Sequence, residues 1–323
     1  PALDAYKNGE LKIIPERFGK IYVNWLENIR DWNISRQLYW GHRLPVYYTE
    51  DGEVIVSKEE PDESKYGKVR RDEDTLDTWF SSALWPFSTL GWPDEDSEDY
   101  KYFFPTDTLI TGYDIIFFWV IRMVFSSIYN TGTLPFNTVY LNGIVRDAEG
   151  RKMSKSLGNG VDPLDEVEKY GTDALRFNLV SGNSPGNDFR YIEKEVEDKR
   201  NFANKLWNAS RFIFMNMEDK EYSIDRDKLT IEDKWIISRI NTLAKDIDRL
   251  LNQYEIGIVA TNLYQFIWFE FCDWYIEFVK TRLNGEEKDN AIAVLLHVLD
   301  QILRLLHPYM PFITEEIYSY LPN

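Results

Sequence analysis

The chain has 323 residues, of which 44% are hydrophobic and 15% aromatic, and its formal net charge at pH 7 is −17. This length exceeds one ordinary hydrophobic core and predicts two folded domains, while the hydrophobic content excludes a disordered tail. The single cysteine, Cys272, excludes an intramolecular disulfide framework, and the acidity means that any nucleic-acid partner must be inferred from specific residues.

No apolar run approaches the length of a membrane span. The longest, "IIFFWVIRMVF", is interrupted by the charged residue Arg122. A single cysteine suits a reducing compartment. We therefore expect a soluble, cytoplasmic protein without a membrane partner.

The first 188 residues show the pattern of an α/β domain. Residues 51–74 predict a short ribbon, because the Asp51-Gly52 turn signal precedes alternating valines. Further on, residues 106–111 predict a short buried strand, residues 114–130 an apolar helix and residues 137–145 a second strand. This order predicts an α/β region.

Helical periodicity dominates the remainder. Residues 162–171 and 172–182 predict two helices, the first opened by Asp162 as N-cap with Pro163 in its first turn. From 189 to 323 the sequence predicts an all-α helical bundle, so we place a domain boundary at 188. Within it, "LYQFIWFEFCDWYIEFVK" carries aromatic residues all round, which predicts a helix buried on more than one side.

One small basic loop follows the second strand. Lys152 and Lys155 flank Met153-Ser154, and glycines 150, 158 and 160 frame them. Lysine ammonium groups on a glycine-hinged loop suit the binding of phosphate oxygens that move during a reaction. For an arbitrary K-x-x-K sequence, a solvated surface loop is the alternative.

The full octapeptide "KMSKSLGN" resembles the signature loop of the class I aminoacyl-tRNA synthetases. That resemblance implies that the loop stabilises the triphosphate of ATP while the carboxylate of an amino acid attacks the α-phosphate. It also implies catalytic roles for four residues of the loop: Lys152, Met153, Ser154 and Lys155.

Several further segments resemble the valyl family within this class: "NWLENIRDWNISRQLYWGHRLPVYY", "LDTWFSSALWPFSTLGWP", "TGYDIIFFWVIRM", "NFANKLWNASRF" and "FIWFEFCDWYIE". The resemblance implies the second half of a class I Rossmann-type domain followed by an anticodon-binding bundle. The implied activity is valine–tRNA ligation, with valine, ATP and Mg²⁺, and tRNA(Val) as substrates and partners and no protein partner. A non-catalytic tRNA-binding module and an isoleucyl-type synthetase are the alternatives.

The resemblance also implies site residues. In the family, the residues matching Trp79, Ile115 and Trp119 line the amino-acid pocket, although ordinary core packing is the alternative for each. Asp77 either binds the substrate ammonium or belongs to an internal ion pair. The expected ATP-binding residues are Lys155, Gly112, Asp114, Asn142 and Gly143, with a helix N-cap as the alternative for Asp114.

Basic residues recur along the first long helix of the predicted bundle. In the family this domain docks the anticodon stem-loop of tRNA, so these cations are candidate phosphate contacts. A solvated helix face is the alternative for each. The candidates are Lys194, Lys199, Arg200, Lys205 and Arg211.

Some features of the family do not occur in these 323 residues. The His-Ile-Gly-His signature, the editing insertion and the C-terminal coiled coil are missing, so we expect a fragment that is inactive or nearly inactive alone. The segment "YYTEDGEV" lacks the cysteine pairs that many valyl enzymes carry there, so we expect no zinc.

Overall fold

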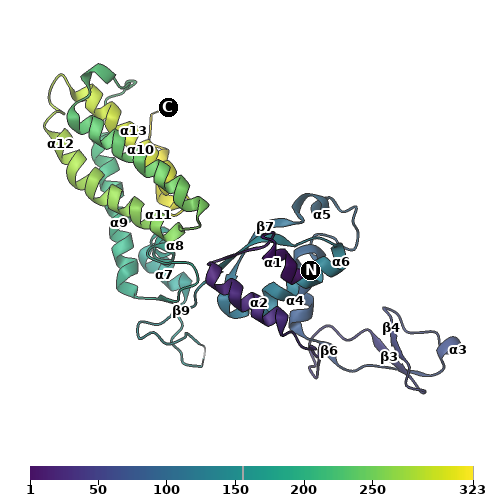
Figure 1. The fold of residues 1–323 in the computed structure, drawn as a ribbon. Coiled ribbons are helices and arrows are strands. Elements are labelled where there is room, and N and C mark those ends of the chain that lie inside the picture. Colours follow the sequence, from purple (N-terminus) through teal and green to yellow (C-terminus); the bar gives the residue numbers. More distant parts are fainter. Residues whose placement is uncertain (155, 323) are drawn as a thin grey trace. The chain divides into compact units, whose positions relative to one another are not determined.

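The structure is a computed structural model that describes residues 1–154 and 156–322. It divides into two compact units, residues 1–142 and 143–323 (Figure 1). The predicted class, an α/β region followed by helices, is confirmed. The domain boundary predicted at 188 lies within the second unit and stays a prediction.

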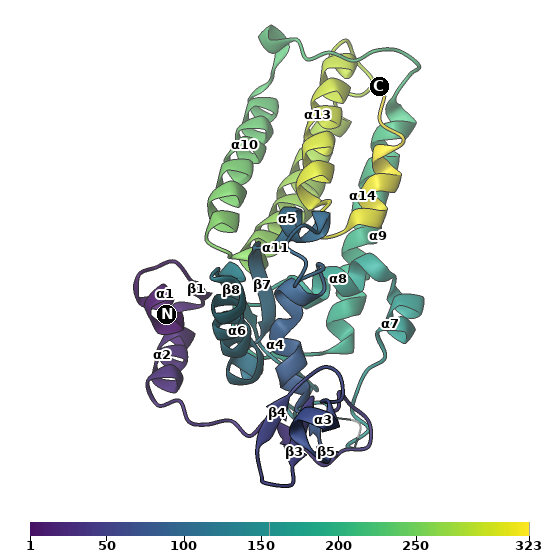
Figure 2. The same cartoon turned by 90° about the vertical axis from the view of Figure 1, so that its right-hand side faces the viewer.

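A three-stranded parallel sheet forms the centre of the first unit. Its order is β1 (Lys12–Ile14), β8 (Phe136–Asn142) and β7 (Thr106–Gly112). Helices α1 (Ala2–Lys7), α2 (Gly19–Glu27) and α6 (Ile121–Thr131) contribute to one hydrophobic core with these strands (Figure 2).

The strand predicted over 106–111 is found, but it is buried on one face only. Leu109 and Thr111 are buried, whereas Ile110 between them is 61% exposed. The reason is its place in the sheet: among the residues described, β7 pairs with β8 alone and the core covers one of its faces.

The chain after β7 forms a continuous helical segment with three kinds of winding. A 3₁₀ turn, η2 (Tyr113–Ile115), leads into a π-helical turn, η3 (Ile116–Val120), and then into α6. The apolar helix predicted over 114–130 is thus present, although its start is not α-helical. Helix α4 (Thr78–Ser88) packs against both α6 and η3.

Two small antiparallel sheets complete the first unit, with the short helices α3 (Glu63–Tyr66) and α5 (Glu98–Phe103) and the 3₁₀ turn η1 (Glu16–Phe18). One sheet places β3 (Val46–Thr49) between β4 (Val54–Val56) and β5 (Val69–Arg71). The β3–β4 hairpin confirms the turn predicted at Asp51-Gly52. In the other sheet, β2 (Ser35–Arg36) pairs with β6 (Thr75–Leu76).

The second unit begins with a short parallel pair, β9 (Val145–Arg146) and β10 (Phe189–Arg190), and with helices α7 (Pro163–Tyr170) and α8 (Thr172–Val180). The predicted cap of α7 is confirmed, because Asp162 Oδ1 accepts a hydrogen bond of 2.9 Å from the backbone N–H of Leu164. Pro163 occupies the first turn, where its missing N–H costs nothing.

The rest of this unit is the predicted helical bundle (Figure 1). Its elements are α9 (Glu193–Asn216), η4 (Arg226–Lys228), α10 (Ile231–Asn252), α11 (Ile256–Gln265), the π-helical stretch η5 (Phe266–Tyr275), α12 (Ile276–Lys280), α13 (Lys288–Leu306) and α14 (Pro311–Tyr318). One large hydrophobic core joins them. None of the helices in the described ranges is long and apolar enough to cross a membrane.

The aromatic segment over 263–280 packs against neighbouring helices but is not buried all round. Phe271 and Tyr275 are fully buried, but Trp274 is 57% exposed and Phe278 41% exposed. The two exposed rings lie 5.7 Å apart, so they cover one another in part. Three of the eight aromatic residues in this segment are exposed, so one face stays open. The π-helical stretch η5 packs against both α9 and α10, which agrees with the predicted burial on more than one side.

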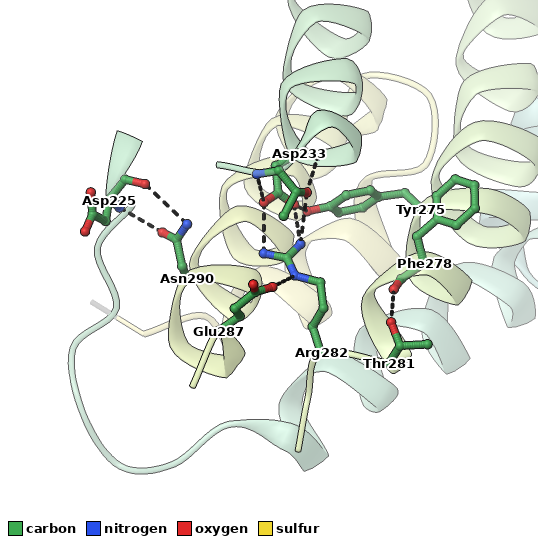
Figure 3. Close-up of polar contacts among 9 residues, drawn as sticks. Asp225, Asp233, Tyr275, Phe278, Thr281, Arg282, Glu287 and Asn290 are labelled. Carbon is green, nitrogen blue, oxygen red and sulfur yellow. Dashed lines mark hydrogen bonds and ion pairs between the residues drawn. The ribbon is translucent and has the colours of Figure 1, made fainter. Parts of the chain in front are cut away.

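A buried polar cluster joins several helix ends in the bundle (Figure 3). Asp233, in the first turn of α10, accepts two hydrogen bonds from the guanidinium of Arg282, at 2.8 and 3.0 Å, and one of 2.6 Å from the hydroxyl of Tyr275. Arg282 Nε also donates to Glu287, the N-cap residue of α13. Burial raises the pKa of Asp233, but the donors from Arg282 and Tyr275 outweigh it and lower the pKa below its usual range.

Candidate amino-acid and nucleotide site

Trp79 lies in the first turn of α4. The preceding Asp77 caps this helix, because its Oδ1 accepts a 2.9 Å hydrogen bond from the backbone N–H of Trp79. The indole is half-buried and stacks on Phe118 of the π-helical turn, with ring centres 5.8 Å apart. Trp79 is therefore a fixed aromatic surface that keeps part of its area exposed.

Trp119 is fixed separately. Its Nε1 donates a 3.0 Å hydrogen bond to the carbonyl oxygen of Ser82, and its ring centre lies 5.8 Å from that of Trp85. It lines a groove of about 510 Å³ together with Trp85, Phe103 and Ile110. Trp79 and Ile115 do not line this groove. Trp79 on α4 and Trp119 on η3 thus come from two elements that pack together, but the two rings do not share this groove.

Asp77 is buried and its carboxylate already has several donors. Oδ2 accepts a 3.0 Å hydrogen bond from Trp32 Nε1 and forms a close ion pair with Arg36. Of the two roles left open for this residue, these contacts are those of the internal ion pair. Its predicted role toward a substrate ammonium stays a prediction.

The carboxyl ends of two parallel strands meet at Gly112 and Asn142, which are paired across β7 and β8. Asn142 and Asp114 are exposed. An added Cβ at Gly112 would lie 2.7 Å from Asp114 Oδ1, so the carboxylate folds back over this glycine. Adjacent strand ends of this kind are where α/β sheets bind ligands, which is the geometry predicted for the nucleotide.

Gly143 has a packing reason to be glycine. A Cβ there would lie 1.7 Å from the backbone oxygen of Asn187, within the second unit. Any side chain would displace the turn over 183–188. Its predicted role in ATP binding stays a prediction, since this close approach explains the residue without a ligand.

The basic loop of the second unit is organised by two side chains that the sequence analysis did not single out. Asp147 accepts hydrogen bonds from the backbone N–H and the Nε of Arg151, both at 2.7 Å, and from Asn159 Nδ2 at 2.8 Å. Asn159 Oδ1 in turn accepts a 2.9 Å bond from the backbone N–H of Ser154. The two arms of the loop are thus tied together through one carboxylate and one amide.

The predicted catalytic residues of the loop have different surroundings. Lys152 is exposed, and Ser154 Oγ lies 3.1 Å from Ser156 Oγ. Met153 packs against a small core that includes Leu175 and Tyr191, so it anchors the loop to the body of the unit. Lys155 lies outside the described residues.

The order of this loop should be acid-sensitive only at very low pH. Burial raises the pKa of Asp147, but the hydrogen bonds from Asn159 and Arg151 outweigh it and lower the pKa to about 2. A carboxylate with a lowered pKa contributes stability above its unfolded value, near 4, and that stability is lost as the pH falls through about 2. We expect the Asp147 carboxyl carbon to titrate near pH 2 by NMR; a midpoint near 4 would contradict this contact network.

The candidate tRNA contacts of α9 fall into two groups. Lys194 pairs with Glu197 at 2.8 Å, Arg200 with the same Glu197 at 3.6 Å, and Lys205 with Asp273 at 2.5 Å. Lys199 lies over the ring of Tyr264 at 5.3 Å, and Arg211 lines an apolar groove. Within the ranges that the structure describes, neither Lys199 nor Arg211 has a carboxylate partner.

Comparison with known proteins adds the deciding observation. Residues 1–191 match the family described as tRNA synthetases class I (I, L, M and V), and residues 233–323 match the anticodon-binding domain of tRNA ligase. The chain belongs to the class I tRNA synthetases.

Relatives within this family are close in sequence. The chain is 60% identical to the valine–tRNA ligase of Clostridium acetobutylicum, over 99% of this chain and 37% of that protein. It is 57% identical to that of Symbiobacterium thermophilum, over 100% of this chain and 36% of that protein. The chain thus spans little more than a third of the length of these relatives.

Solved structures in the family share the fold at lower identity. Methionyl-tRNA synthetase of Mycobacterium tuberculosis in complex with methionyl-adenylate superposes with a TM-score of 0.78 at 19% identity, over 98% of this chain and 60% of that chain. The Agrobacterium radiobacter leucyl enzyme, solved as a ternary complex with tRNA, gives 0.71 at 22% identity, over 94% and 44%.

The residues that the sequence analysis missed differ in how visible they are. Asn159 belongs to the "KMSKSLGN" octapeptide itself, so the motif contained the signal. Asp147 stands before a glycine turn, which is a weaker sequence signal. The partners of Asp77 gave none, because Trp32 and Arg36 are 45 and 41 positions away from it.

Proposed function

We propose that this chain carries the amino-acid pocket, the phosphate-binding loop and the anticodon-binding bundle of a valine–tRNA ligase. The supporting observation is the identity of 53–60% to valine–tRNA ligases along nearly the whole chain. A non-catalytic tRNA-binding module does not account for the ordered basic loop. An isoleucyl-type synthetase is not among these relatives.

The proposed reaction begins with attack of the valine carboxylate on the α-phosphate of ATP. The bond to the β-phosphate breaks, pyrophosphate leaves, and valyl-adenylate forms. A hydroxyl of tRNA(Val) then attacks the valyl carbonyl carbon, the bond to the phosphate breaks, and AMP leaves. Mg²⁺ enters with ATP. In this scheme Lys152 and Lys155 neutralise negative charge on the departing phosphates, which is where preorganised cations lower a barrier most.

The proposed pocket selects by shape and polarity. Trp79 and Trp119 are each held in place by hydrogen bonds and ring stacking, so each presents a fixed apolar surface. Because only Trp119 lines the groove described above, we propose Trp79 as the wall that contacts the branched aliphatic side chain. A rigid pocket wall makes binding of a substrate with one extra methylene less favourable by about 1–3 kcal/mol. This supports valine over a larger aliphatic side chain.

The activity is tested in a chimera. Residues 1–323 replace the matching section of the Clostridium acetobutylicum ligase, and valine-dependent ATP–pyrophosphate exchange is measured. The matched control carries the corresponding section of the Symbiobacterium thermophilum ligase, whose identity to this chain is similar. We expect both chimeras to exchange pyrophosphate with valine. A folded, inactive chimera beside an active control would contradict the proposal.

For tRNA, the proposal favours Lys199 and Arg211, the two α9 candidates that have no carboxylate partner among the described residues. Replacing Arg211 with alanine is expected to weaken binding of tRNA(Val) and to reduce the slope of log affinity against log salt by about one. Lys194→Ala is the control, because Glu197 and Asp198 already neutralise that ammonium. Filter binding at several salt concentrations measures both. Equal effects of the two variants would count against Arg211 as a phosphate contact.

A further inference from the structure

Arg122 is a buried cation with an unmet hydrogen-bonding group. It lies in the first turns of α6, is 8% exposed, and is surrounded by apolar residues of the helix such as Ile121 and Met123. Its Nη1 is buried and, within the described part of the chain, has no hydrogen-bond partner. A buried charge without full partners is costly, and an apolar side chain of similar volume would suit this position better.

The contacts of Arg122 are with aromatic rings. Its guanidinium carbon lies 3.5 Å from the ring centre of Trp32 and 5.9 Å from that of Phe118. A guanidinium lying on an aromatic face in a desolvated site is held by both dispersion and cation–π attraction. Arg122 therefore lies directly on the ring of Trp32 and within cation–π distance of the ring of Phe118.

Both rings lead directly to Trp79. Trp32 Nε1 donates at 3.0 Å to Asp77, whose other carboxylate oxygen accepts the backbone N–H of Trp79 at 2.9 Å. Phe118 stacks on the Trp79 indole, with ring planes 24° apart. Trp79 is thus supported by the cap at its backbone and by the stack on its ring, and the Arg122 guanidinium lies behind both supports.

The charged groups around Arg122 are consistent with one fixed position of its guanidinium. Burial lowers the pKa of Arg122, attraction to Asp77 opposes this, and repulsion from Arg36 adds to the lowering. Arginine nevertheless stays protonated in proteins. Two arginines thus face one carboxylate, and Asp77 is held by Arg36 while Arg122 stays on the ring of Trp32.

We propose that Arg122 is a positioning residue that sets the orientation of Trp79 in the pocket through Trp32 and Phe118. This inference rests on the proposed function, because that function makes Trp79 a pocket residue. The orientation of the Trp79 ring in the free chain does not depend on any ligand. The packing of α4 alone leaves the Trp79 indole partly exposed. Arg122 holds this ring in position as an aromatic wall of the pocket.

The test uses this chain labelled with 5-fluorotryptophan and observed by ¹⁹F NMR. Trp79→Phe identifies the Trp79 resonance. In Arg122→Met we expect that resonance to shift or broaden more than those of Trp235 and Trp268 in the second unit, while thermal unfolding stays at or above the wild-type temperature. Arg122→Lys keeps the charge but loses the planar face, and we expect a smaller change in the same direction.

The control is Arg304→Met, which removes an exposed arginine from α13 of the second unit and should leave the Trp79 resonance unchanged. An unchanged Trp79 resonance in folded Arg122→Met and Arg122→Lys would overturn the proposal. Because no valine is added, this result is separate from the function. A Trp79 resonance that moves in Arg122→Met, beside a folded chimera that does not exchange pyrophosphate with valine, would contradict the pocket assignment and leave the positioning role standing.

Discussion

Replacing Lys155 with alanine in the chimera is expected to lower the rate of valine-dependent ATP–pyrophosphate exchange about 10²–10³-fold, the usual effect of removing one preorganised transition-state donor. The negative charge on the pyrophosphate group grows as its bond to the α-phosphate breaks, so an ammonium there acts mainly in the transition state. We therefore expect kcat to fall while the KM for valine changes little.

The matched control for this variant is Lys169→Ala. Lys169 is an exposed lysine of the same unit, on α7, and it pairs with Glu193. Lys169→Ala removes the same charge and the same type of side chain, but at a position away from the loop. The effect of this variant on the exchange rate should therefore be less than about twofold. An unchanged rate in Lys155→Ala, or an equal loss in both variants, would remove the loop from the mechanism.

Replacing Asp233 with asparagine is expected to lower the free energy of unfolding of the helical bundle by about 3–5 kcal/mol, the cost of breaking a buried ion pair from one side. Asp233 is fully buried, and the side chain of Arg282 is only 12% exposed. The variant removes the buried charge that faces this guanidinium and leaves it only the exposed carboxylate of Glu287. It also weakens the bond from the Tyr275 hydroxyl (Figure 3). Urea unfolding followed by the helical circular dichroism signal measures the loss.

The control compares this pair with an exposed one of the same chemistry. Asp300 and Arg304 form an ion pair of 2.9 Å four residues apart on α13, with the arginine side chain 61% exposed. Asp300→Asn should cost less than about 1 kcal/mol, because water already screens that pair. Equal losses in the two variants would show that burial adds nothing to the Asp233 cluster.

Local features of this fold could be predicted from the sequence, and features set by distant neighbours could not. The cap of α7 was predictable because Asp162 and Pro163 act on the turn that they begin. The burial of β7 was not, since the exposure of Ile110 depends on which strands lie beside it. The exposed face of the segment over 263–280 likewise depends on where the other helices pack.

The candidate site shows the same division. A motif of eight residues identified the basic loop, and Asn159 within it ties that loop together. Asp77 remained open between two roles because its partners Trp32 and Arg36 come from a different stretch of chain. Arg122 was visible only as the charge that interrupts an apolar run. Its contacts with Trp32 and Phe118 required the fold.

The measurement that tests the central claim most directly is the ratio of exchange rates, in the chimera, with valine and with isoleucine or threonine. If residues 1–323 supply a valine pocket, exchange with valine should exceed exchange with isoleucine at least about tenfold, as expected for rejection of one methylene by rigid walls. A chimera that exchanges pyrophosphate equally well or better with isoleucine, beside a control that prefers valine, would contradict the account.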